Sequence, residues 1–245
     1  MCNEIALRLT VATRAQRLYE YRPTFPDLLP TMTKADIIQR LLDPGIIAII
    51  RADSSEQLVE AAEALLNGGV TAMEVTMTTP GALGVIAEVT SRFRDQILMG
   101  VGSVIDAATV AAAVQAGAEF IVTPVTKPEV IAAANRLEKP IASGAFTPTE
   151  CLLAHESGAD FVKLFPAEAV GPAYIKSLLA PLPQLRIVPT GGVTPATVAA
   201  FHQAGSVAYG VGSALVSKEI LRARDWARLT AKAVEFVAAV RAAKG

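Results

Sequence analysis

Cysteine, histidine and an excess of charge of either sign are scarce in this sequence. Only two of its 245 residues are cysteines, Cys2 and Cys151, which excludes a disulfide framework and favours a reducing, cytoplasmic environment. The two histidines, His155 and His202, have no histidine or cysteine partner nearby, so we expect no metal site. The formal net charge of −1 gives no electrostatic footprint for nucleic acid or an anionic membrane.

Long apolar runs are also missing. No stretch is long enough to span a bilayer, and no secretory pattern opens the chain. We therefore expect a cytoplasmic protein with no membrane partner. Residues 1–32 differ from the rest of the chain, because they carry four arginines and then a proline-marked piece. We predict a loosely ordered N-terminal extension there, and we assign it no function.

Apolar residues make up 52% of the sequence, enough for a large core, and from Thr33 onward short apolar runs alternate with helical stretches. Thr33 can cap the first helix and Ser54 the next one, and several later helices end in a glycine. Eight βα units predict an α/β protein with one (β/α)8 TIM barrel domain over residues 33–245 and an N-terminal helix. A doubly wound open sheet is the alternative. The predicted strands are 46–50, 72–77, 97–100, 120–123, 140–143, 161–163, 186–189 and 207–210.

Lys163 lies in an otherwise apolar run, Phe-Val-Lys-Leu-Phe-Pro, over residues 161–166. Burying an ammonium is costly, so burial favours the neutral amine, which is the form that attacks a carbonyl carbon. The pattern therefore indicates an imine-forming lysine. It also fits a lysine at the end of a strand whose amine reaches water past apolar neighbours.

The second predicted strand carries an acidic residue. Strand side chains alternate, so Glu74 and Thr76 share one face while Met73 and Val75 share the other. The apolar face should contact the helices, which directs Glu74 into the barrel near the mouth where Lys163 would lie. Two interpretations stay open: a structural ion pair, and an acid/base group beside an imine-forming lysine.

Glycine clusters come after the last two predicted strands: Thr-Gly-Gly at 190–192 and Gly-Val-Gly-Ser at 210–213. Phosphate binding by the loops after strands 7 and 8 recurs in TIM barrels. Glycine lets backbone amides approach an anion closely, and a helix N-terminus adds a favourable dipole. The clusters favour a phosphate site, with simple tight turns as the alternative.

Together, the motifs at 69–76, 100–104, 123–124, 163–168, 189–193 and 212–213 resemble the 2-keto-3-deoxy-6-phosphogluconate (KDPG) / 4-hydroxy-2-oxoglutarate aldolases. These are class I enzymes that act through a lysine imine, and the resemblance covers about residues 33–243. It implies cleavage of a keto-acid phosphate, with no cofactor, by a homotrimer. The substrate could be KDPG, 4-hydroxy-2-oxoglutarate or the epimeric 6-phosphogalactonate compound.

The resemblance also implies roles for single residues. Lys163 would form the imine, and Glu74 would move protons during imine formation and C–C cleavage. Ser103 stands where the family usually has a threonine that contacts the keto acid, and Phe165 and Pro124 would form walls of the pyruvate pocket. The implied phosphate cradle consists of Thr190, Gly191, Gly192, Gly212 and Ser213.

Two positions, Thr78 and Ser143, depart from the family pattern. Many members have an arginine four residues after the glutamate, and this position is Thr78 here, which we keep as a candidate substrate-binding residue. Arg51 stands where related members carry an arginine, so we hypothesise that it binds the substrate's carboxylate or phosphate. Ser143 replaces the usual proline before Gly144. Both changes affect which substrate is chosen.

Two other functions fit the same patterns. A phosphosugar isomerase or a thiamine-phosphate-type synthase would use the phosphate site without an imine on Lys163. A non-catalytic barrel that only binds a phosphorylated metabolite would show protection by phosphate without turnover. Borohydride trapping with pyruvate separates the aldolase from both.

Overall fold

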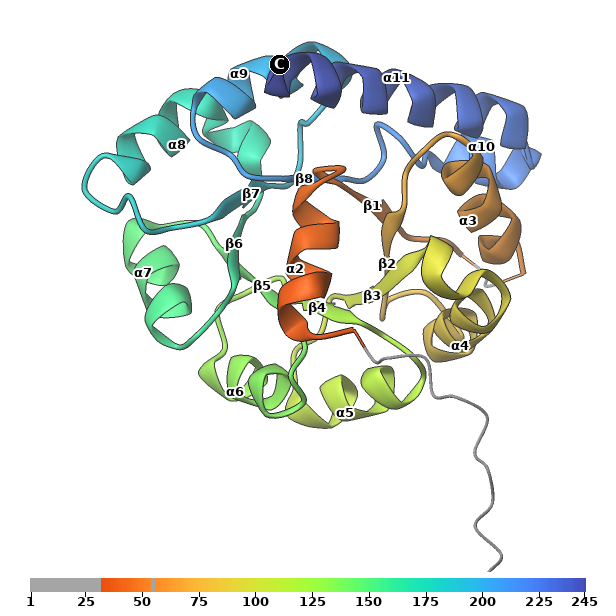
Figure 1. Ribbon diagram of the computed structural model, residues 1–245, viewed down its shortest axis with the longest axis horizontal. Helices are drawn as coiled ribbons and strands as arrows, with labels where there is room; N and C mark the ends of the chain where they lie inside the picture. Colours follow the sequence, from red (N-terminus) through yellow and green to blue (C-terminus); the bar gives the residue numbers. More distant parts are fainter. Residues whose placement is uncertain (1–31, 54–55) are drawn as a thin grey trace, which may run out of the picture. The chain divides into compact units, whose positions relative to one another are not determined.

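Eight short parallel strands form the centre of the part of the chain that the structure, a computed structural model, describes: residues 32–53 and 56–245 (Figure 1). Each strand is almost fully buried, as expected for strands covered on both faces. The strands are β1 (Ile46–Ile50), β2 (Ala72–Thr76), β3 (Leu98–Gly102), β4 (Phe120–Val122), β5 (Ile141–Ala145), β6 (Phe161–Leu164), β7 (Ile187–Pro189) and β8 (Tyr209–Val211).

The strands succeed one another in chain order around a barrel. Each strand from β1 to β6 pairs with the next, and β1 also pairs with β8. The remaining join, between β7 and β8, consists of an isolated parallel bridge between Thr190 and Gly210 and a hydrogen bond from the Val207 amide to the Ile187 carbonyl. The sheet therefore closes on itself, which confirms the predicted TIM barrel and excludes the open doubly wound sheet.

Helices surround the barrel as an outer ring (Figure 1). Outward-facing side chains such as Val75, Met99 and Val162 pack against them in one continuous apolar core. The last and longest of these helices packs against both α3 and α9. The ring comprises α3 (Leu58–Asn67), α4 (Ala82–Phe93), α5 (Ala107–Gln115), α6 (Pro128–Arg136), α7 (Pro148–Glu156), α8 (Gly171–Leu179), α9 (Pro195–Gln203), α10 (Lys218–Ala223) and α11 (Trp226–Lys244), with short 3-10 turns η1 (Arg94–Gln96) and η2 (Ala167–Ala169).

One helix lies across the barrel rather than around it (Figure 1). This is α2 (Lys34–Leu42), which leads directly into β1 and buries Ile37 and Leu41. The predicted cap at Thr33 is confirmed, since its side chain accepts a hydrogen bond from the Asp36 amide in a capping box. Lys34 forms an ion pair of 2.9 Å with Asp160, one residue before β6. The helix therefore covers the amino ends of the strands and leaves their carboxyl ends open.

Two predicted strand ends are wrong by two residues. The predicted third and fifth strands end at residues 100 and 143, but β3 continues to Gly102 and β5 to Ala145. Their glycines do not stop the strands, because they make room for neighbours: a Cβ at Gly100 would lie 2.4 Å from the Phe120 ring, and one at Gly144 would lie 2.2 Å from the Pro124 backbone.

The N-terminal segment offers fewer comparisons. The predicted extension over residues 1–32 lies outside the described residues except for Met32, and so does Ser54, which we expected to cap the next helix. That helix, α3, begins later, at Leu58, with Gln57 at its N-cap. Over the range that the structure covers, no helix combines the length and apolar character needed to cross a bilayer.

Candidate active site

A cavity of about 320 Å³ opens at the carboxyl ends of the strands, opposite α2. Its walls come from the ends of β1, β2, β6 and β8 and from the loops after β3, β4 and β7. Eleven of the twelve predicted site residues line it: Arg51, Glu74, Ser103, Pro124, Lys163, Phe165, Thr190, Gly191, Gly192, Gly212 and Ser213.

Lys163 and Glu74 meet inside this cavity. Both side chains are buried, with residue exposures of 9% and 1%, and Lys163 Nζ lies 3.7 Å from Glu74 Oε1. This distance is that of an ion pair rather than a hydrogen bond, and Oε1 has no hydrogen-bond partner among the described residues. A buried carboxylate without a hydrogen bond can exchange a proton with a group that enters the cavity.

The environment of Glu74 changes its acidity. Burial raises the pKa of the Glu74 carboxyl above its ordinary value. The positive charge of Lys163 opposes this rise, and that of Arg51 opposes it to a smaller extent. A raised pKa brings a carboxyl group closer to the pH at which it can both accept and donate protons. Gly102 on β3 makes room for the group, since a Cβ there would lie 2.6 Å from Glu74 Oε1.

Lys163 lies beside the aromatic ring of Phe165, with Nζ 5.6 Å from the ring centroid. Phe165 is 42% exposed and lies at the cavity rim. On the neighbouring strands, Thr123 Oγ1 accepts a hydrogen bond from the Gly144 amide and donates one to the Val125 carbonyl. These bonds fix the backbone on both sides of Pro124, so the predicted pocket wall is rigidly placed.

The loop after β7 has a backbone that requires glycine. Gly191 and Gly192 adopt φ values of +93° and +71°, which L side chains rarely adopt. The second cluster differs, because Gly212 has an ordinary φ and a Cβ there would meet nothing closer than 4.0 Å. Within the described residues, the amides of Gly192, Gly212 and Ser213 donate no hydrogen bond. These donors are available to an anion.

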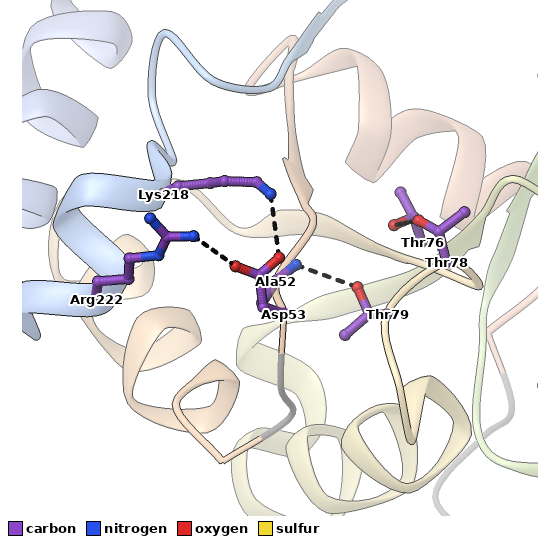
Figure 2. Close-up of polar contacts among 7 residues, drawn as sticks. All are labelled: Ala52, Asp53, Thr76, Thr78, Thr79, Lys218 and Arg222. Atoms are coloured by element: carbon purple, nitrogen blue, oxygen red, sulfur yellow. Dashed lines mark hydrogen bonds and ion pairs between the residues drawn. The ribbon is translucent and has the colours of Figure 1, made fainter.

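Ser103 and Arg51 both line the cavity, whereas Thr78 does not. Ser103 has a positive φ of +60°, and a strained backbone of this kind is often found at functional sites. Thr78 is exposed, and its hydroxyl lies 2.9 Å from that of Thr76, which does line the cavity (Figure 2). Thr78 therefore contacts a residue of the cavity wall and does not line the cavity itself.

Three other positions differ from what the sequence suggested. Ser143 pairs with Val162 inside β5, so it lies on the helix-facing side, and its buried hydroxyl has no partner within the described chain. Two charged cavity residues, Glu168 and Lys218, were not predicted. Glu168 covers the glycine turn, since its Oε2 lies 1.8 Å from where a Gly191 Cβ would be. For Glu168, only its place at the end of the motif over residues 163–168 could have indicated a position in the cavity.

Fold and site together define a class: a (β/α)8 barrel with a buried lysine–carboxylate pair and a glycine-lined anion cradle at its open end. Residues 37–232 match the family described as KDPG and KHG aldolase. The 2-dehydro-3-deoxy-phosphogluconate aldolase of Pseudomonas aeruginosa is 36% identical over 194 residues, which are 78% of this chain and 88% of that relative. The chain belongs to the KDPG/KHG aldolase family.

Solved structures agree with this assignment. A native KDPGal structure superposes with a TM-score of 0.76 and 33% identity, covering 81% of this chain and 95% of that one. A KDPG aldolase from Legionella pneumophila, which holds pyruvate as a covalent carbinolamine intermediate, has a TM-score of 0.74 and 26% identity. That comparison covers 83% of this chain and 97% of the relative.

Proposed function

We propose that this chain is a class I aldolase that cleaves KDPG, its 6-phosphogalactonate epimer or 4-hydroxy-2-oxoglutarate to pyruvate and an aldehyde. One observation carries the proposal: Lys163 and Glu74, both buried, lie 3.7 Å apart in a cavity at the carboxyl ends of the strands. An ion pair that only supported the fold would not need to face a cavity. Family membership and the carbinolamine captured by the Legionella relative support the same chemistry.

The reaction begins at Lys163. Its neutral amine attacks the ketone carbon of the substrate, and loss of water from the carbinolamine gives an iminium ion. The electron pair of the C3–C4 bond then flows into the iminium, which becomes an enamine. At the same time the C4 hydroxyl loses its proton, and the aldehyde, glyceraldehyde 3-phosphate in the case of KDPG, leaves.

Glu74 is the acid/base group in this scheme. Its carboxylate takes the C4 hydroxyl proton, and the resulting acid returns a proton to the enamine carbon. Water then hydrolyses the imine, which frees pyruvate and restores the amine. Burial raises the pKa of Glu74, which makes its protonated form more accessible and helps one group to serve in both directions.

The remaining cavity residues bind the substrate. Phe165 and Pro124 enclose the pyruvate part, and Ser103 contacts the keto acid. Arg51, the only arginine among the described cavity-lining residues, binds the carboxylate. The amides of the glycine cradle bind the phosphate.

Borohydride reduction in the presence of pyruvate tests the proposal. We expect a stable adduct on Lys163 whose mass gain equals pyruvate less one oxygen. Lys163→Met should lose the adduct and at least about 10³-fold of the lyase activity, because the covalent route is gone. Lys176→Met removes an exposed lysine outside the cavity and should keep both.

The outcome separates this proposal from its rivals. An isomerase, a synthase or a simple binding protein would yield no pyruvate adduct on Lys163, and normal turnover by Lys163→Met would refute the imine. A homotrimer, which the resemblance implied, and a cytoplasmic location, which the scarcity of cysteine indicated, are also part of the proposal.

A further inference from the structure

An ionic cluster is formed by Asp53, Lys218 and Arg222 (Figure 2). Lys218 and Arg222 both extend from α10 toward Asp53, which comes soon after β1. Lys218 Nζ lies 3.1 Å from Asp53 Oδ1, and Arg222 donates to Oδ2 at 3.0 Å. One carboxylate thus holds two cations from one helix.

The two cations differ in their relation to the cavity. Lys218 lines it, whereas Arg222 does not. Lys218 also comes shortly after residues 212–216, the loop that carries Gly212 and Ser213 of the cradle. The side chain of Lys218 therefore starts only a few residues after the backbone amides that we assign to the phosphate.

Asp53, the acid that pairs with Lys218, follows a residue whose backbone is held by a hydrogen bond. The Ala52 amide donates to the hydroxyl of buried Thr79 at 3.2 Å, which joins the segment after β1 to the loop after β2 (Figure 2). Arg222 and then Lys218 lower the pKa of Asp53, so its carboxylate stays ionised at neutral pH. Its side chain is nevertheless 61% exposed, and that of Lys218 is 60% exposed. Exposed ion pairs contribute little free energy and exchange readily.

The charges within the cavity leave Lys218 without another partner there. Among the described lining residues, the cations are Arg51, Lys163 and Lys218, and the acids are Glu74 and Glu168. Lys163 is paired with Glu74, and we assign Arg51 to the carboxylate of the substrate. The acid Glu168 lies against the cradle and would repel a phosphate dianion. An additional cation near the cradle would offset this repulsion.

We propose that Lys218 is a phosphate-binding residue that selects phosphorylated keto acids, and that Asp53 holds it at the rim until the substrate arrives. The inference deepens the proposed function and rests on it. When Lys218 turns to the phosphate, Asp53 keeps Arg222 as its partner, so no charge is left unpaired. Lys218 thereby brings a cation to the cavity from the segment after β8, the strand that pairs with β1.

Steady-state kinetics with KDPG and with the same keto acid lacking phosphate test this role. Lys218→Ala should raise KM for KDPG about tenfold, through loss of one charge-assisted hydrogen bond, and leave KM for the unphosphorylated acid within about twofold. Lys218→Arg should restore KM for KDPG to within about threefold. Inhibition by inorganic phosphate should weaken in parallel with the rise in KM.

The two partners of the cluster serve as matched controls. Asp53→Asn releases Lys218, so KM for KDPG should fall about twofold. Arg222→Gln removes a positive charge from the same helix outside the cavity and should leave KM within about twofold. A merely structural cluster would make Lys218→Ala and Asp53→Asn change KM in the same direction, and that result would overturn the inference. So would an unchanged KM in folded Lys218→Ala.

Failure of this inference is distinguishable from failure of the proposed function. Pyruvate carries no phosphate, so its borohydride adduct on Lys163 should form equally in wild type and Lys218→Ala. Normal trapping without any phosphate-dependent change refutes only the role of Lys218. Absence of trapping in the wild type refutes the aldolase itself.

Discussion

At the scale of the residue, Glu74 is a carboxyl group in an electrostatically unfavourable environment. Only 1% of it is exposed, its Oε1 accepts no hydrogen bond within the described chain, and Lys163 at 3.7 Å compensates only part of its desolvation. A carboxyl group in this position binds a proton more tightly in the folded protein than in the unfolded chain. Its titration must therefore alter folding stability as well as catalysis.

The sign of that effect is set by the direction of the pKa shift. Above the ordinary value of 4.5, the unfolded chain has lost a proton that the folded state keeps, so the free energy of unfolding falls as pH rises toward the raised pKa. The slope reaches at most about 1.4 kcal/mol per pH unit. Glu74→Gln should remove this loss, as measured by urea unfolding at several pH values between 4.5 and 8.

Glu88→Gln is the control, because Glu88 is an exposed glutamate on α4. Its unfolding profile should match that of the wild type. Parallel profiles for Glu74→Gln and the wild type would contradict the raised pKa. Lyase activity of Glu74→Gln should fall about 10²–10⁴-fold in the same preparation.

Single residues were predictable where alternation or a motif fixed them. The period of two along β2 was enough to direct Glu74 inward, and desolvation pointed to Lys163. Glu168 and Lys218 escaped prediction because charged residues on turns and short helices are usually solvated, and their position over the cavity depends on contacts between distant segments. Ser143 was misplaced because the end of β5 was set two residues early.

At the scale of the element, the packing of α11 depends on one small residue. Gly68 ends α3 with ordinary backbone angles, yet a Cβ there would lie 2.3 Å from Ala233 Cβ and 2.7 Å from the Thr230 carbonyl oxygen, both on α11. Thr230 also donates to the Ala64 carbonyl at 2.8 Å. Gly68 therefore permits the close contact by which the last helix completes the ring.

Gly68→Ala should lower the free energy of unfolding by about 1–3 kcal/mol, because the added methyl group has no room between the two helices. Gly84→Ala is the matched control: a Cβ at this position in α4 would meet nothing within 4 Å. It should be neutral or up to about 1 kcal/mol stabilising. Equal stability of the two variants in urea unfolding would contradict the tight packing of α11.

Elements were predictable from periodicity, and their ends were not. Apolar runs identified all eight strands, and helix caps such as Thr33 were predictable from residue type. The glycines at 100, 102 and 144 misled us because glycine more often stops an element than makes space inside one. Only the residue that each glycine meets on the neighbouring strand or just after it, Phe120, Glu74 or Pro124, reveals whether the glycine stops the strand or makes space within it.

At the scale of the barrel, the helix that stabilises the fold and the cavity that carries the chemistry lie at opposite ends of the strands. The helix α2 covers the amino ends of the strands and buries Ile37 and Leu41, while the cavity occupies the carboxyl ends. This separation is general in TIM barrels, and it means that the two functions can be changed independently.

Leu41→Ala should therefore lower the free energy of unfolding by about 2–5 kcal/mol without changing KM at a temperature where the variant is folded. Urea unfolding and steady-state kinetics on the same preparation check both parts. A rise in KM that accompanies the loss of stability would show that the two ends are coupled. Lys34→Ala, which removes the partly exposed ion pair with Asp160 and a 2.7 Å hydrogen bond to Asn135, should lower the free energy of unfolding by about 1–2 kcal/mol.

The join between β7 and β8 contains an isolated bridge, between Thr190 and Gly210, so a ligand bound beside it could strengthen the barrel wall. Elsewhere the ladder between neighbouring strands uses most backbone donors, but here Gly192, Gly212 and Ser213 retain theirs within the described chain. A bound phosphate would give acceptors to both sides of this gap. The bound substrate would then link the last two strands through hydrogen bonds. The barrel would be held more firmly while the phosphate is bound than after the product leaves.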